Sequence, residues 1–318
     1  MDRRRRRAWA LALVLALGAS DSLWADPVPA LRAMRWIAPG TDPVRVFATA
    51  PTECLKRPTT APERLSVEIG RAAFRTPLLL GGQAARAGLS CESCHRSGRD
   101  NPDFQFPGAS GAPGTADVTL SLFSSHRGNG VHDPKTIPDL SGPRDRLKIA
   151  PPALPTFIRG LIVEEFDGTE PTPATLAGLA SYVSALRPEA CPRSAWTPIT
   201  PAGLLADARR AVRAAQEADD PRTAILMVAG ARAQLGLIDE RYGALPTEQA
   251  RLRKADAELA GLQTALRRDQ REAAKMASDW LVASEPLKRV LEAKVGLSLF
   301  NPARLSEAAN RRLPAKPT

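Results

Sequence analysis

Several residue types are scarce in this sequence of 318 residues, and their scarcity excludes some classes of protein. Aromatic residues make up 5%, and the chain holds three histidines, four methionines and four cysteines. So few cysteines in so long a chain exclude a disulfide-dense miniprotein, and no collagen-type glycine repeat is present. The apolar run Ala8–Ala19 has twelve residues, whereas a membrane-spanning helix needs about 20. A protein with many such helices is therefore excluded.

The rest of the composition is typical of a folded, positively charged protein. Apolar residues make up 43% and charged residues 25%, so the chain can build a core. The length exceeds the about 100–150 residues of one ordinary domain, which favours two domains or one domain with an appendage. The formal net charge is +10. Neither a basic patterned helix nor a base-stacking motif indicates a nucleic-acid partner.

The first 25 residues have the order of a secretory signal peptide. A basic run, Arg3 to Arg7, precedes the apolar run, polar residues follow it, and Ala25 is a small residue at the expected cleavage site. A membrane anchor is the alternative, but the apolar run is short for one. Residues 1–25 hold five arginines and two aspartates, so their removal leaves a net charge of +7. Such a surplus suits acidic protein partners or anionic membrane surfaces.

The central part of the chain predicts two helices separated by a long irregular segment. Residues 26–61 are proline-rich and are expected to be an irregular leader. A helix is expected after Pro62, with an apolar stripe at 3–4 spacing, and Pro77 ends it. Thr172 as N-cap and Pro173 at the first helical position predict a second helix that stops before Pro188. Residues 96–156 lack periodicity, and so long a segment is expected to wrap around something.

The C-terminal part predicts a small antiparallel helical bundle over residues 200–300. Helices are expected over 201–217, after Pro221, after Pro246 and, as a short helix, over about 286–295. Residues 301–318 are expected to be a flexible tail. The predicted fold class is therefore mainly α.

One motif carries specific chemistry: Cys91-Glu92-Ser93-Cys94-His95 matches the c-type haem attachment pattern C-x-x-C-H. Two thiols on one turn of chain can form thioethers to the two vinyl groups of one porphyrin, and the adjacent imidazole can bind its iron. A thioredoxin-like pair would need a βαβ context, a zinc site would need two further ligands, and a simple disulfide is a third alternative. The motif in an exported chain favours one covalent haem c held by Cys91, Cys94 and His95, with His95 as the iron ligand.

With these features, the predicted haem domain, residues 62–195, resembles a class I c-type cytochrome domain, and the likeness covers roughly residues 63–188. Ile69 to Phe74 is similar to the N-terminal helix of that family, whose glycine and aromatic residue let the C-terminal helix approach closely. Tyr182 and Val183 are their counterparts on the crossing helix. The stretch from Gly70 to His95 is also similar to the first haem domain of bacterial cytochrome c peroxidases. Those proteins hold two haems, whereas this chain has one C-x-x-C-H motif.

The second axial ligand of the iron stays open from the sequence. His126 and His132 in the long loop are candidates, as are Asn101, Tyr182, the methionines Met34, Met227 and Met276, or no protein ligand. The loop residues Arg96, Arg99, Arg127 and Lys135 are candidates to pair with haem propionates. Cys54 and Cys191 flank the two predicted helices on the outside, and an oxidising compartment favours a disulfide between them.

These observations predict an exported, periplasmic mono-haem cytochrome that transfers electrons. Its expected partner is an acidic redox protein, and peripheral contact with a membrane is a further option. A peroxidase-like haem enzyme with an open distal site is the alternative. A haem-based sensor or assembly protein, in which the bundle binds a partner, is the third.

Overall fold

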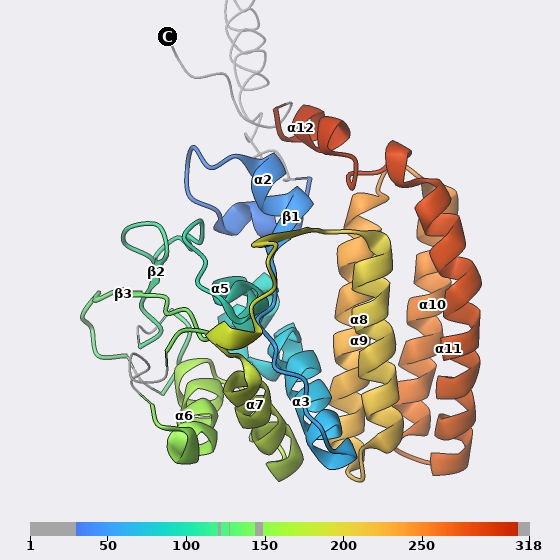
Figure 1. The fold of residues 1–318 in the computed structure, drawn as a ribbon, viewed down its shortest axis with the longest axis horizontal. Coiled ribbons are helices and arrows are strands. Elements are labelled where there is room, and N and C mark those ends of the chain that lie inside the picture. Colours follow the sequence, from blue (N-terminus) through green and yellow to red (C-terminus); the bar gives the residue numbers. More distant parts are fainter. Residues whose placement is uncertain (1–29, 120–121, 127, 144–148, 311–318) are drawn as a thin grey trace, which may run out of the picture.

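The structure is a computed structural model that describes residues 30–119, 122–126, 128–143 and 149–310. The predicted signal peptide, residues 1–25, lies outside the described residues. Helices dominate, in agreement with the predicted class. Figure 1 shows them side by side in the order α6, α7, α3, then α8 and α9, then α10 and α11. Within the described part of the chain, no helix is long and apolar enough to cross a membrane.

The two helices predicted in the central part are present and cross each other closely. Helix α3 spans Ala61–Phe74 and begins with a capping box between Thr60 and Glu63. Helix α7 spans Pro173–Ala185, and the Thr172 side chain accepts a hydrogen bond from the backbone of Thr175. They meet at two glycines: a Cβ on Gly70 would lie 1.9 Å from the carbonyl oxygen of Gly178. Only residues without a side chain permit this approach.

The C-terminal bundle is also present, with one boundary predicted wrongly. Its helices are α8 (Pro201–Glu217), α9 (Pro221–Arg241), α10 (Pro246–Ala265) and α11 (Gln270–Ala293). The short helix expected over about 286–295 is the last part of α11, and Pro286 lies inside that helix rather than at its start. Trp280 before the proline and Leu291 after it are both buried, so packing on both sides offsets the backbone hydrogen bond that proline removes.

The bundle and the central helices share one hydrophobic core. Helix α3 lies between α7 on one side and α8 and α9 on the other (Figure 1). Gly230 of α9 approaches the end of α3 closely, since a Cβ there would be 3.3 Å from the carbonyl oxygen of Ala72 in α3 and 2.6 Å from Oγ1 of Thr76, just after the helix. The apolar residues of both regions form one continuous cluster. The expected ranges 62–195 and 200–300 thus differ in secondary structure but do not have separate cores.

The predicted leader and the predicted tail contain regular structure and pack against each other. The leader holds a 3₁₀ helix η1 (Arg32–Trp36), helix α2 (Pro43–Ala48) and strand β1 (Thr49–Pro51). Helix α12 spans Pro302–Asn310, so the expected flexible tail is wrong for these residues. Leu305 is fully buried in a small cluster with Leu31, Val46 and Phe47. The tail's partner lies some 260 residues earlier in the chain, and no local pattern reveals it. Residues 311–318 lie outside the described part.

The described residues of the long segment predicted to be irregular hold little regular structure, but aromatic residues of this segment belong to the core. Phe104, Phe106 and Phe123 are buried in the main cluster. The remaining elements are short: η2 (Pro77–Leu79), α4 (Gly82–Ala87), α5 (Cys91–Cys94), η3 (Arg96–Gly98), β2 (Thr115–Ala116), β3 (Lys135–Thr136), η5 (Pro151–Ala153), α6 (Leu154–Gly160), the π-helix η6 (Leu161–Glu165), η7 (Pro188–Ala190), β4 (Trp196–Pro198) and η8 (Val295–Leu297). Antiparallel pairs join β1 with β4 and β2 with β3.

Candidate functional site

The C-x-x-C-H motif forms one helical turn. Gly88, with a φ of 80°, ends α4 and redirects the chain. Ser90 then caps the four-residue helix α5 and exchanges hydrogen bonds with Ser93. The backbone amide of His95 donates to the carbonyl of Cys91 at 2.9 Å. Both thiols therefore lie on a single turn, with the imidazole directly after it.

The two thiols of the motif are neither bonded to each other nor activated. Cys91 and Cys94 are free and half-buried. Burial raises the pKa of each thiol to about 12. A redox-active Cys-x-x-Cys pair needs a lowered pKa, because the thiolate is the reacting species. The environment of this motif therefore argues against a thioredoxin-like function.

The imidazole of His95 is oriented by a hydrogen bond. Its Nδ1 lies 3.0 Å from the carbonyl oxygen of Pro138, which is 43 residues later in the chain. Burial lowers the pKa of His95 to about 4, although this hydrogen bond and the charge of Asp139 act in the opposite direction. The ring is thus neutral at pH 7, and since a carbonyl only accepts, the proton is on Nδ1. Nε2 is left with its lone pair free, as a metal-ligating histidine requires.

A buried charge cluster lies between the motif and α3. The carboxylate of Glu53 accepts hydrogen bonds from Tyr182 at 2.7 Å and from Arg75 at 2.9 Å, and it pairs with Arg71 at 2.5 Å. Burial alone would raise the pKa of Glu53, but the guanidinium groups of Arg75 and Arg71 and the Tyr182 hydroxyl lower it to about 2. Tyr182 also packs edge-on against Phe74, with ring centroids 5.2 Å apart.

Glu92, within the motif, connects the helical turn of the motif to this cluster. One of its oxygens accepts a hydrogen bond from the backbone of Ser97 at 2.8 Å. The other lies 3.7 Å from Nε of Arg75 and has no hydrogen-bond partner in the described part of the chain. Burial raises the pKa of this carboxyl group. The sequence offered no prediction for Glu53, Arg75 or Glu92, because their partners come from separate segments.

The predicted disulfide is present. The sulfur atoms of Cys54 and Cys191 are bonded, across 137 residues of sequence. A bridge between Leu55 and Leu186 and a hydrogen bond from Arg187 N to Cys54 O at 2.9 Å lie beside it. The disulfide therefore joins the leader to the segment that follows α7.

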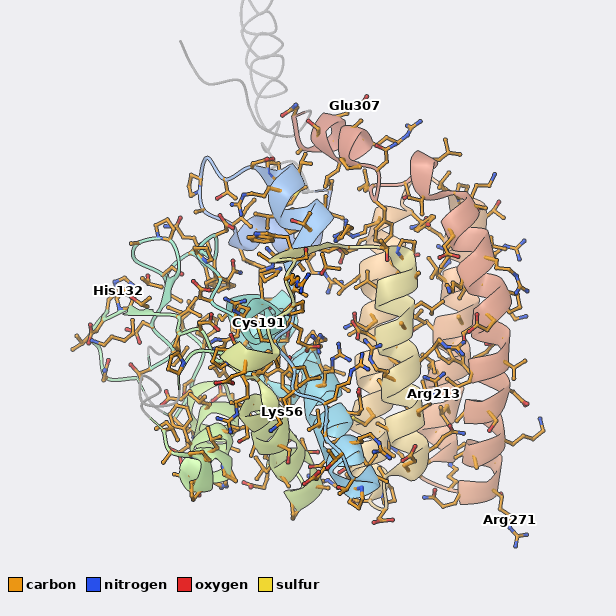
Figure 2. The ribbon with its side chains drawn as sticks, viewed as in Figure 1. Lys56, His132, Cys191, Arg213, Arg271 and Glu307 are labelled. Atoms are coloured by element: carbon orange, nitrogen blue, oxygen red, sulfur yellow. A yellow bond between two sulfur atoms is a disulfide. The ribbon has the colours of Figure 1, made fainter. Side chains whose placement is uncertain are left out.

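Most candidates for the second axial position have other contacts. His126 is 63% exposed, with Nε2 3.8 Å from the carboxylate of Asp167. His132 is exposed and lies at the outer edge of the loop region (Figure 2). The Asn101 amide donates to the Ser93 carbonyl at 2.8 Å, and the Tyr182 hydroxyl is hydrogen-bonded to Glu53 as described above.

The methionines are accounted for by apolar packing. Met34 packs against the small cluster of the leader. Met227 is fully buried in α9, and Met276 of α11 is half-buried against the main core. The surroundings of these three methionines therefore do not single out any of them as an iron ligand.

The basic residues proposed for propionates also have protein partners. Arg96 donates to the carbonyls of Val46 and Thr49, Arg99 pairs with Asp139 at 2.7 Å, and Lys135 pairs with Asp133 at 2.5 Å. Arg127 lies outside the described residues.

Neither a cluster of metal-ligating side chains nor a known relative accompanies the motif. Across the residues that the structure describes, no three or more histidine, cysteine, aspartate or glutamate side chains gather as a metal site would require. No known family model matches the chain, and neither a curated protein nor a solved structure is significantly similar to it.

Proposed function

We propose that this protein is an exported mono-haem c-type cytochrome that transfers electrons. The observation that carries the proposal is the state of the motif: two unpaired thiols on one turn, next to a neutral imidazole whose Nδ1 donates to Pro138. A simple disulfide would join the thiols, and a thioredoxin-like pair would lower their pKa. Neither describes this site, whereas haem attachment needs two free thiols and one available imidazole nitrogen.

The residues present fit a covalent haem. Cys91 and Cys94 would hold it by thioethers, and Nε2 of His95 would bind the iron. Bound haem supplies a one-electron Fe(III)/Fe(II) couple. The chain's own part is to keep the imidazole neutral by burial, to orient it through Pro138, and to pack Phe74 near it, with ring centroids 6.3 Å apart.

We extend the proposal to location and partner. The signal-peptide pattern and the Cys54–Cys191 disulfide support a periplasmic protein, since disulfides persist in oxidising compartments. The charge of +7 without residues 1–25 supports an acidic redox protein as partner, with peripheral contact to anionic membranes as a further option. The likeness to class I cytochromes and to a single-haem relative of the bacterial peroxidases supports the same function.

Covalent attachment is the first test. The chain should be expressed with a working cytochrome maturation apparatus, extracted with acid–acetone, denatured, and stained on a gel for haem peroxidase activity. We expect a coloured band that disappears in the Cys91→Ala/Cys94→Ala variant. The matched control, Cys54→Ser/Cys191→Ser, removes the same number of cysteines and should keep the colour. A colourless wild-type band would overturn the proposal.

A peroxidase-like enzyme is the second candidate, and one observation favours it. Asn101 and Tyr182 are hydrogen-bonded elsewhere and Met227 is in the core, so these three side chains are not free to bind the iron. A weakly held or open position would admit peroxide.

Optical and electron paramagnetic resonance spectra of the holoprotein in both oxidation states separate the two functions. A low-spin iron unaffected by carbon monoxide or peroxide supports the carrier, and a high-spin iron that binds them supports the enzyme. His126→Ala and His132→Ala, made separately, test the two loop histidines, and an unchanged spectrum in both excludes them as ligands.

A further inference from the structure

The carbonyl that orients His95 belongs to a loop without regular structure, so something must hold it in place. Pro138 itself has no amide hydrogen to donate. Two contacts attach its loop to the segment directly after the motif. The amide of Leu140 donates to the carbonyl of Gly98 at 3.1 Å, and Nε of Arg99 donates to Oδ2 of Asp139 at 2.7 Å.

The Asp139 side chain is held at both oxygens. While Oδ2 accepts from Arg99, Oδ1 accepts from the backbone amide of Ser141 at 2.8 Å and from its hydroxyl at 2.7 Å. Arg99 is in turn held from its other side, with Nη1 3.5 Å from Sγ of Cys54 in the disulfide. Both side chains of the pair are about 30% exposed. The pair therefore fixes the residue that directly follows Pro138.

We propose that Arg99 and Asp139 are positioning residues for His95: their ion pair holds the Pro138 carbonyl against Nδ1 and so sets the donor strength of Nε2. The inference deepens the proposed function and rests on it. A hydrogen bond from Nδ1 to a fixed acceptor raises the basicity of the imidazole. A more basic axial ligand stabilises the ferric over the ferrous state and lowers the reduction potential. A loosened Pro138 loop should therefore raise the potential.

A direct effect of charge can be separated from this positioning effect, because the two have opposite signs in one variant. Arg99→Gln removes a positive charge, which by Coulomb's law alone would favour the ferric state and lower the potential. The same variant removes the partner of Asp139 Oδ2 and so loosens the Pro138 carbonyl, which raises the potential. Asp139→Asn raises the potential by either route, so it measures the size of the effect but not its cause.

The experiment is a redox titration of the purified holoprotein with covalent haem, at constant pH, with the ferric electron paramagnetic resonance spectrum as a second readout. For Arg99→Gln and Asp139→Asn we expect an upward shift equal to a threefold to tenfold change in the reduction equilibrium. That is about 30–59 mV, at 59 mV per tenfold for one electron. The g values should move in both variants.

Asp256→Asn is the matched control. It breaks an arginine–carboxylate pair of similar exposure, between Arg232 of α9 and Asp256 of α10, and should leave the potential and the spectrum unchanged. Should Arg99→Gln fail to accumulate, Arg99→Lys keeps the charge but not the guanidinium geometry, and a smaller upward shift is expected. A downward or absent shift in the Arg99 variant overturns the positioning role while the haem stain still supports the proposed function. A wild-type chain without haem overturns both.

Discussion

Gly70 and Gly178 bring α3 and α7 into backbone contact: a Cβ on Gly178 would lie 2.9 Å from the amide nitrogen of Gly70. This crossing places Phe74 of α3 against Tyr182 of α7 and near His95. The two glycines thus determine how the helices behind the candidate haem site are arranged.

Gly70→Ala should destabilise the protein by about 1–3 kcal/mol, because the new methyl group meets the Gly178 carbonyl and the helices must separate. Urea unfolding measures this. Gly236→Ala on α9 is the control, since a Cβ there meets nothing within 4 Å. Alanine's higher helix propensity should leave that variant up to about 1 kcal/mol more stable. Equal stability of the two variants would show that the helices do not cross this closely.

The Glu53 cluster should make the protein sensitive to acid. The pKa of the Glu53 carboxyl group is about 2 in the folded chain, whereas its ordinary value is 4.5. The ionised Glu53 carboxylate therefore stabilises the folded state fully above about pH 4.5, and this stabilisation is lost as the pH falls through about 2. Its size is on the order of 3 kcal/mol.

Glu53→Gln tests this by thermal unfolding between pH 2 and 7. The variant should be less stable by about 3–5 kcal/mol at pH 7, because the arginines lose their buried partner, and its stability should depend less on pH in the acidic range. Asp279→Asn breaks the exposed pair with Lys275 and should leave the stability nearly unchanged, because water screens such a pair. An acid profile of Glu53→Gln identical to that of the wild type would contradict the assignment.

The Cys54–Cys191 disulfide should contribute to stability and not to haem attachment. Cys54→Ser/Cys191→Ser should lower the free energy of unfolding by about 2–5 kcal/mol, since the bond closes a loop of 137 residues. Denaturant unfolding with and without reductant measures this. Reductant should have no further effect on the variant. A wild type that is equally stable when reduced would contradict a structural role.

Helix α12 should be part of the folded protein. Leu305→Ala should lower the free energy of unfolding by about 2–5 kcal/mol if the small cluster unfolds together with the rest of the protein. If the cluster unfolds locally, the variant should instead expose the C-terminal segment to limited proteolysis. Leu297→Ala, at a position 46% exposed, should change stability by at most about 0.5 kcal/mol. Indistinguishable behaviour of the two variants would mean that α12 does not dock on the leader.

Local signals in the sequence predicted α3 and α7 to α10, which are among the longer helices. Thr172 caps α7 as the sequence predicts, because a cap depends only on the backbone of the next few residues. Thr60, Thr200 and Asp220 cap α3, α8 and α9 in the same way. Prolines at the first helical position mark α7 to α10 correctly. The same rule failed at Pro286, where the buried face of α11 continues through the proline.

Contacts between distant segments escaped prediction for a different reason. No periodicity or spacing connects His95 to Pro138, Glu53 to Arg75, or Leu305 to Val46. The disulfide was predicted only because two expected helices brought its flanks together. Likewise, a separate bundle was expected because the amino-acid composition changes near residue 200. The shared core depends on close helix packing, which the small residue Gly230 allows where α9 meets the end of α3.

The sequence alone determined that two thiols and an imidazole lie close together, because Cys91, Cys94 and His95 fall within five residues of the chain. Tertiary structure decided everything that depends on burial and on remote partners. It sets the neutral state of His95, the acceptor for its Nδ1, and the ion pair of Arg99 with Asp139. Hydrogen bonds and desolvation act over a few ångströms in space, and only the folded chain brings residues 95, 99 and 139 within that range.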